Sequence, residues 1–485
     1  MLAASDWSLR TRDVIYNSFS LARTTAGSAV LELRHRGQAD ALASVQAIAH
    51  GGADVVLAAY PALVRLAARC GLSRFVPALR RRYGADLPLA VYASDRLLQT
   101  PVRTVRELAA WLGPHEADVI DLSLGAPVFD SLSPRTAKLA ADERGYPPTG
   151  GLPELRRSIA QFLADFFRES FDPDTEILVT PGATGALAVV LDAFVSRGDS
   201  VVLLDPCHLH FPLALAYRGA RIRWVPTHVV AGEIRFQLED LARAMRRARL
   251  ILLNSPCNPS GAMITREGFE EIAWYACRRD VLVVCDEVYA AYCYDRPWDS
   301  AAHVRSIRQR TLVLGSMSKT FALAAYRVGW IAGPCELLRA CLLSQSLTVP
   351  FVSTLSQYLA VDALSRAETI VHRIVSDFRR RRDYVADRLR ACGLDAYPPA
   401  GAFYYWIPIP AHWQSSRQFC AEALQKHRVL LVPGAFFGPS GDRYFRLSYA
   451  GDEARLHEGL HRLGHMLNSP CTSLHTSSHT WAQAA

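Results

Sequence analysis

The chain has 485 residues, of which 50% are hydrophobic and 21% charged, and its formal net charge is +8 at pH 7. This length allows two or three domains with buried cores, and the composition is that of a soluble globular protein. No apolar stretch is long enough to cross a bilayer, and charged residues interrupt the first dozen positions, so we expect a cytoplasmic protein without a membrane partner. Eleven cysteines without a CxxC pair predict no metal site.

Residues 1–90 form a block rich in alanine, arginine and leucine, with helical periodicity in places. Residues 102–112 have the pattern of an amphipathic helix, and an apolar run follows at 119–124. The composition and the hydrophobic pattern of the sequence therefore change near residue 91. We predict an N-terminal extension of unknown role before that point.

From residue 177 onward, short runs of valine, isoleucine and leucine alternate with helical patterns. Strands are predicted at 177–179, 201–204, 250–253, 281–285 and 311–314, with helices starting near Gly185 and Arg266. This alternation predicts an α/β fold whose largely parallel sheet is covered on both faces. Beyond residue 340, long helical patterns and strands at 401–408 and 444–449 predict a smaller α+β domain.

One lysine stands out in this arginine-rich chain. Only three of the 54 basic residues are lysines, namely Lys138, Lys319 and Lys426. Lys319 follows the apolar run 311–315, where a lysine can lose its proton or form a Schiff base and an arginine can do neither. The alternative is an ordinary solvated lysine at the end of a strand.

Other predicted strands also end in residues with useful chemistry, and such strand ends gather at one edge of a parallel sheet. Asp286 ends an apolar strand, where a carboxylate needs a cationic partner such as a protonated ring nitrogen. Tyr289 supplies a phenol. Asn258 supplies an amide on a turn between two prolines, so both could hold a ring oxygen.

A phosphate site is indicated at residues 182–185, which lie at a strand-to-helix junction. Free backbone N–H groups and the helix dipole favour an anion at such a position. Ser316, Ser318 and Arg327 could complete the site, with the arginine as a bidentate anchor. Together with Lys319 and the ring partners, these groups describe a site for pyridoxal 5′-phosphate (PLP).

From about residue 91 to 465 the chain resembles the fold-type-I PLP enzymes of the class I/II aminotransferase family. The matching motifs, in the family's order and spacing, are Ser123–Pro127, Tyr146–Arg156, Asn254–Gly261, Asp286–Tyr289, Ser316–Lys319 with Arg327, and Arg446–Tyr449. The resemblance implies a large domain with a mostly parallel, seven-stranded-type sheet and a smaller α+β C-terminal domain. The expected divisions are an extension at 1–90, the first part of the catalytic unit at 91–140, a PLP-binding domain at 141–340, a small domain at 341–465 and a disordered tail at 466–485.

The resemblance also implies individual roles. Lys319 would hold the cofactor as a Schiff base and move the substrate's Cα proton, while Asp286 would keep the pyridine nitrogen protonated. Asn258 and Tyr289 would hold the ring oxygen. The expected phosphate ligands are Ala183, Thr184, Ser316, Ser318 and Arg327, with Tyr146 supplied by the neighbouring subunit of a homodimer. The expected substrate contacts are Arg446, to the α-carboxylate, and the backbone of Gly125.

The chain departs from the family where a tyrosine or tryptophan usually stacks on the cofactor ring. The corresponding segment, 205–211, places His208 at that position. An imidazole can stack and can also carry a proton, which would add an acid/base group over the ring. Passive stacking, or replacement by Phe211, is the alternative. No arginine occurs between Arg339 and Arg366, where dicarboxylate-specific members often bind the distal carboxylate.

Three functions remain open from the sequence. The main interpretation is an aminotransferase acting on a small-molecule α-amino acid. The second is an enzyme of elimination or γ-replacement, possibly on S-adenosylmethionine, like 1-aminocyclopropane-1-carboxylate synthases. The third is a transcription regulator with an aminotransferase-like effector domain, because residues 66–82 faintly resemble a helix-turn-helix. Pro77 would fall inside the recognition helix, so a nucleic-acid partner is not expected.

Overall fold

The computed structural model describes residues 108, 111, 115, 118–127, 129, 145–394 and 396–468, all within the unit Glu107–Ala485. The predictions for the extension 1–90 and the helix-turn-helix at 66–82 lie outside these residues. Of the helix predicted at 102–112, only residues 108 and 111 are described, and both are helical. Of the disordered tail predicted at 466–485, residues 466–468 instead belong to the helix Glu453–Asn468, and the remainder lies outside the described residues. Within the described part, no helix is long and apolar enough to cross a membrane.

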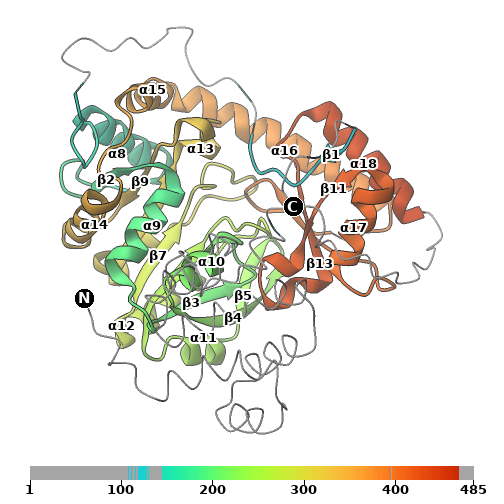
Figure 1. The fold of residues 1–485 in the computed structure, drawn as a ribbon, viewed down its shortest axis with the longest axis horizontal. Helices are drawn as coiled ribbons and strands as arrows, with labels where there is room; N and C mark the ends of the chain where they lie inside the picture. Colours follow the sequence, from blue (N-terminus) through green and yellow to red (C-terminus); the bar gives the residue numbers. More distant parts are fainter. Residues whose placement is uncertain are drawn as a thin grey trace, which may run out of the picture. The chain divides into compact units, whose positions relative to one another are not determined.

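An eight-stranded sheet forms the main body, in the order β2-β9-β8-β7-β6-β3-β4-β5 (Figure 1). Its strands are β2 (Ile177–Thr180), β3 (Ser200–Asp205), β4 (Arg221–Val230), β5 (Glu233–Phe236), β6 (Ala248–Asn254), β7 (Leu282–Asp286), β8 (Thr311–Ser316) and β9 (Gly329–Ala332). Strands β4, β3, β6, β7 and β8 are parallel neighbours, whereas β9 is antiparallel to β2 and β8.

The sheet has one strand more than the seven-stranded type we expected. The extra strand, β5, forms an antiparallel hairpin with β4. Ala231 and Gly232 connect the two strands, and both have positive φ angles, +50° and +77°. Two such residues match the twist of a two-residue hairpin turn, which explains the additional edge strand.

Helices cover both faces of the sheet, as predicted. Their bounds are α8 (Pro153–Phe167), α9 (Gly182–Phe194), α10 (His210–Tyr217), α11 (Leu238–Ala244), α12 (Arg266–Arg279), α13 (Met317–Thr320), α14 (Cys335–Thr348), α15 (Thr354–Leu364), α16 (Ala367–Ala391), α17 (Ser416–His427) and α18 (Glu453–Asn468). Short 3₁₀ helices are η4 (Ala301–His303), η5 (Arg305–Arg310), η6 (Ala324–Tyr326), η7 (Gly434–Phe436) and η8 (Pro439–Arg443).

The continuous apolar runs of the central strands follow from this two-sided cover. In β6, Leu250 and Leu252 belong to the core that includes residues of α9, α10 and α14. The alternate residues Ile251 and Leu253 belong to the core that includes residues of α11 and α12. Because successive side chains of a strand point to opposite faces, both sets must be apolar when both faces are buried.

A second group of strands lies beside α16, α17 and α18 (Figure 1). Strands β10 (Tyr404–Pro408), β13 (Tyr444–Ser448) and β12 (Val432–Pro433) form an antiparallel sheet, and β1 (Ile120–Asp121) pairs in parallel with β11 (Val429–Leu430). Strand β10 starts later than the predicted residue 401. The N–H groups of Gly401 and Ala402 are bound instead to Gly261 O and Tyr292 O in other loops.

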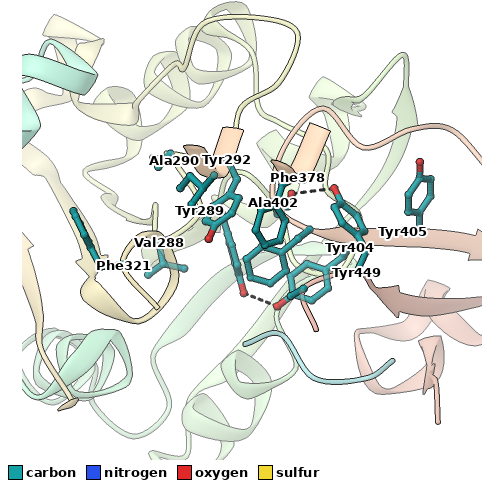
Figure 2. Close-up of a cluster of buried hydrophobic side chains, with 14 of the residues drawn as sticks. Val288, Tyr289, Ala290, Tyr292, Phe321, Phe378, Ala402, Tyr404, Tyr405 and Tyr449 are labelled. Carbon is teal, nitrogen blue, oxygen red and sulfur yellow. Dashed lines mark hydrogen bonds between the residues drawn. The ribbon is translucent and has the colours of Figure 1, made fainter. Parts of the chain in front are cut away.

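A buried aromatic cluster joins these strands to the main body (Figure 2). Phe378 of α16 lies edge-on to Tyr292, with ring centroids 5.0 Å apart, and Phe403 contacts both rings. The Tyr292 hydroxyl donates to Lys319 O over 2.8 Å. A hydrogen bond from this aromatic cluster therefore helps to fix the backbone of Lys319.

Candidate active site

The polar ends of the parallel strands meet at one edge of the sheet, as predicted. Asn254 at the end of β6 is the register partner of Asp286 at the end of β7. The Asn254 amide donates to Asp286 O over 2.9 Å, and its Oδ1 accepts the Asn258 N–H over 2.7 Å. Two buried strands thus position the carboxyl and amide groups singled out from the sequence.

Lys319 lies in the single helical turn α13 that follows β8. The side chain of Ser316 caps this turn by accepting the Ser318 N–H over 3.1 Å. Lys319 Nζ donates to Gly125 O over 2.6 Å, which brings the predicted glycine to the lysine. Burial, reinforced by the positive charges of Arg446 and Arg327, lowers the pKa of Lys319 to about 8.

The pKa of Asp286 is shifted in the opposite direction from that of Lys319, because burial disfavours the negative charge of its carboxyl group. Burial raises its pKa to about 7, although the Val288 N–H, at 3.2 Å, and the charge of Lys319 favour the ionised form. Among the described residues, no side-chain cation forms an ion pair with it within 4.0 Å. A cationic ligand group beside Asp286 would supply the missing partner.

Arg446 is buried on β13 and its guanidinium binds two neutral acceptors. Nη1 donates to Asn258 Oδ1 over 2.8 Å and Nη2 donates to Ser123 O over 2.5 Å. Nε is buried without a partner, and no carboxylate pairs with the group in the part of the chain the structure describes. On the other side of Asn258, its Nδ2 lies 3.5 Å from the Tyr289 hydroxyl.

The start of α9 forms a cradle for an anion. The helix begins at Gly182, three residues before the predicted start and directly after Pro181, and its first turn contains no acidic residue. A Cβ at Gly182 would come within 2.4 Å of Arg327 Nη2, so the guanidinium lies against this turn. Nη1 of Arg327 donates to Ala324 O over 2.8 Å, which holds the group there.

Two more predicted phosphate ligands stand close together. Ser316 Oγ donates to Ser318 Oγ over 2.9 Å, and both residues are buried where β8 meets α13.

Ala183 and Thr184 occupy the first turn of α9, where backbone N–H groups lack helical acceptors. Free N–H groups, the helix dipole and an arginine are the features that bind phosphate.

His208 lies between β3 and α10, edge-on to Phe211 with ring centroids 5.4 Å apart. Burial lowers the pKa of His208 to about 3, and the positive charges of His210, Arg446 and Lys319 act in the same direction. Its imidazole is therefore neutral at physiological pH. A neutral imidazole is compatible with passive stacking on a ring, and the role of His208 stays a prediction.

Tyr146 differs from the other predicted site residues because its side chain is 87% exposed. It stacks on Phe351, with ring centroids 4.8 Å apart. This position is compatible with a contact to another subunit, as the sequence analysis expected, and the single chain does not bring Tyr146 to the lysine.

Sequence analysis missed Tyr404, although its hydroxyl lies 2.9 Å from that of Tyr289. Its ring faces the Arg446 guanidinium, with Cζ 4.5 Å from the ring centroid. Two tyrosines begin β10 and alternate between its faces, so either could have been the inward one. The sequence contains no motif that selects between Tyr404 and Tyr405.

The sequence and the fold of this chain are similar to those of known proteins. Residues 117–463 match the family model for aminotransferase class I and II. The chain belongs to that family. It is 33% identical to an aspartate aminotransferase of Pyrococcus abyssi and 31% identical to aromatic-amino-acid aminotransferase 2 of Thermococcus litoralis, with 77% of this chain and 98% of each relative covered.

Solved aminotransferase structures have the same fold. The aromatic aminotransferase from Pyrococcus horikoshii matches with a TM-score of 0.68 at 33% identity, over 75% of this chain and 98% of that one. Aspartate aminotransferase from Thermus thermophilus with maleate matches with a TM-score of 0.67 at 27% identity, over 77% and 99%. The protein is thus a PLP-dependent aminotransferase of fold type I.

The described residues fit this cofactor. Its phosphate suits the cradle of α9 and Arg327, and its ring nitrogen suits Asp286, a half-buried carboxyl group that forms no ion pair with a cation among the described residues. Its aldehyde suits a lysine whose pKa is already lowered. Each of these three electrostatic features corresponds to one part of the cofactor.

Proposed function

We propose that this aminotransferase works at the Cα of a small α-amino acid through the groups gathered around Lys319. The observation that carries the proposal is that Arg446 and Arg327 lie close enough to Lys319 for their charges to lower its pKa. None of the three forms an ion pair with a carboxylate in the described part of the chain. Three such cations favour a phosphate and a carboxylate as ligands. When bound, PLP supplies an electron sink for the negative charge that develops at Cα.

Each side chain has a separate task in this proposal. Lys319 binds the cofactor and then moves the Cα proton, since a pKa near 8 leaves part of the amine uncharged close to neutral pH. Asp286 pairs with the ring nitrogen, and Asn258 and Tyr289 hold the ring oxygen. His208 stacks as a neutral ring. The proposed phosphate ligands are Ala183, Thr184, Ser316, Ser318, Arg327 and the neighbouring subunit's copy of Tyr146.

Arg446 binds the substrate α-carboxylate in this proposal, and the Gly125 backbone approaches the substrate beside it. A carboxylate would satisfy the buried Nε and neutralise a guanidinium that now binds only neutral acceptors. Because no arginine lies between Arg339 and Arg366, we propose a substrate without a side-chain carboxylate. The aminotransferases named above favour transamination over elimination or γ-replacement.

We further propose a homodimer in the cytoplasm, with the large and small domains divided near residue 340. The support for a dimer is an exposed apolar surface on α14 and the segment after it. Its members are Leu342, Leu343, Leu347, Val349 and Phe351, together with Tyr146 stacked on Phe351. Such a surface is typical of a subunit interface, and it includes the tyrosine expected to serve the neighbouring site.

Absorbance spectroscopy of the purified protein tests the central assignment. Protein with PLP should show a near-ultraviolet or visible band that borohydride removes, and Lys319→Ala should abolish this band. Lys426→Ala is the matched control, because Lys426 pairs with Glu422 on α17. Retention of a borohydride-sensitive band in Lys319→Ala would show that another residue binds the cofactor.

A further inference from the structure

Tyr404 contacts three different parts of the proposed site. Its side chain is buried, with 1% exposed, and its hydroxyl lies 2.9 Å from the Tyr289 hydroxyl (Figure 2). Its ring lies against the Arg446 guanidinium at 4.5 Å, while Phe437 lies 5.0 Å from the same group. A Cβ built on Gly125 would come within 1.8 Å of the Tyr404 hydroxyl.

Counting protons fixes the direction of the bond between the two phenols once the cofactor is bound. Each phenol has one proton to donate. If Tyr289 donates its proton to the cofactor's ring oxygen, it has none left for Tyr404. Tyr404 must then donate to Tyr289. The Asn258 amide, at 3.5 Å, is a second donor to the same oxygen.

We propose that Tyr404 is a positioning residue that links the arginine for the substrate carboxylate to the phenol for the cofactor's ring oxygen. The inference rests on the proposed function, in which Arg446 and Tyr289 have these two tasks. By donating to Tyr289, Tyr404 strengthens the hydrogen bond that Tyr289 donates onward. A stronger bond stabilises negative charge on the ring oxygen and lowers the proton affinity of the neighbouring lysine-linked nitrogen.

Arg446 makes this effect responsive to substrate. Burial raises the pKa of Tyr404, and the positive charge of Arg446 opposes that rise. A carboxylate bound to Arg446 cancels part of this charge, so Tyr404 becomes a weaker acid and a weaker donor. Binding of a carboxylate should therefore raise the pKa read from the cofactor's absorbance, partly through Tyr404.

The direct test is a pH titration of the absorbance band in holoenzyme. Tyr404→Phe should raise the spectral pKa by about half to one pH unit, the size expected for one lost hydrogen bond. Propionate, a carboxylate without an amino group, should raise the pKa in the unmodified protein and raise it less in Tyr404→Phe. Identical titrations and propionate shifts in the two proteins would overturn the inference.

Tyr405→Phe is the matched control. Tyr405 is the adjacent residue, and its hydroxyl donates to Arg382 O over 2.7 Å, away from Tyr289 and Arg446. It is also fully buried, so the substitution has a similar structural cost. If Tyr405→Phe shifts the spectral pKa as much as Tyr404→Phe, the effect is structural and the inference fails.

A double-mutant cycle gives a second, independent readout. Tyr404 acts through Tyr289, so Tyr404→Phe should shift the spectral pKa much less in a Tyr289→Phe background. Additive shifts would show that Tyr404 acts by another route and would contradict the inference. The proposed function fails separately, if Lys319→Ala keeps the absorbance band that is titrated here.

Discussion

Two sets of charged side chains in this protein, one on the surface and one at the candidate active site, differ in how they are paired. Beside α16 and α18, Arg380 donates to both carboxylate oxygens of Glu453, over 2.5 and 2.8 Å, which lowers the pKa of Glu453 to about 2. At the sheet edge, burial raises the pKa of Asp286 to about 7 and lowers that of Lys319 to about 8. Protein partners satisfy the first set, whereas the second is left without ion pairs.

This difference separates structural charges from ligand-binding charges. A completed surface ion pair gains little from any further ligand and contributes modestly to stability. Charges held in a buried site without ion pairs make the empty protein less stable, and a ligand of the right charges removes that cost. The charges around Lys319 therefore indicate which charges a ligand must carry, whereas the ion pair between α16 and α18 indicates nothing about a ligand.

The largest expected effect is on activity, from Lys319→Arg. The substitution keeps a positive charge, but an arginine neither binds an aldehyde nor gives up a proton near neutral pH. We expect transamination with a panel of amino acids to fall at least about 10³-fold. Lys426→Arg, on α17, should leave the rate unchanged. A similar loss in both variants would mean that the contrast between the two kinds of charge is wrong.

Arg446→Lys should have the next largest effect. A lysine keeps the charge but loses the planar, bidentate geometry for a carboxylate, so kcat/KM should fall about 10- to 100-fold, chiefly through KM. Steady-state kinetics with a monocarboxylic amino acid measure it. Arg380→Lys is the surface counterpart and should leave KM unchanged. A normal KM in Arg446→Lys would remove this arginine from substrate binding.

Asp286→Asn should stabilise the apoprotein near neutral pH. The pKa of Asp286 is raised from 3.8 to about 7 in the folded protein, so the folded state favours the protonated carboxyl group. The group does not oppose folding below about pH 4, and it lowers the free energy of unfolding increasingly as the pH rises to about 7. Asparagine does not titrate, and we expect the variant to be more stable by about 2 kcal/mol at about pH 7.5, with a smaller gap at about pH 5. Urea unfolding of apoprotein at both pH values measures this, and equal gaps would contradict it.

Glu453→Gln should have the smallest effect. It breaks a half-exposed ion pair with Arg380, whose side chain is 58% exposed, so unfolding free energy should fall by only about 0.2–1 kcal/mol. Added salt should shrink the difference further, because it screens the pair. A loss of several kcal/mol in urea unfolding would show that the surface pairs are as costly to disturb as the buried site.

Much of the fold and of the site could be predicted because both depend on local patterns. The apolar runs of β6, β7 and β8 reflect burial on two faces, and the polar residues that end them had to gather at one edge. Asp286, Asn258 and Lys319 were found in this way. The comparison with known aminotransferases confirmed the fold and the cofactor, while the roles of single residues remain predictions.

The parts that were not predicted depend on contacts between distant segments. Tyr404 reaches the site only because β10 pairs with β13, which places it on the same side as Arg446. The stacking of Tyr146 on Phe351 likewise joins two segments more than 200 positions apart. No periodicity or motif in a single segment carries that information.

The close approach of Gly125 to Tyr404 has a consequence for how this enzyme can change. A side chain at position 125 would collide with the Tyr404 hydroxyl, so residue 125 can grow only if residue 404 shrinks. A variant with a larger residue at position 125 would therefore need a smaller residue at position 404 as well.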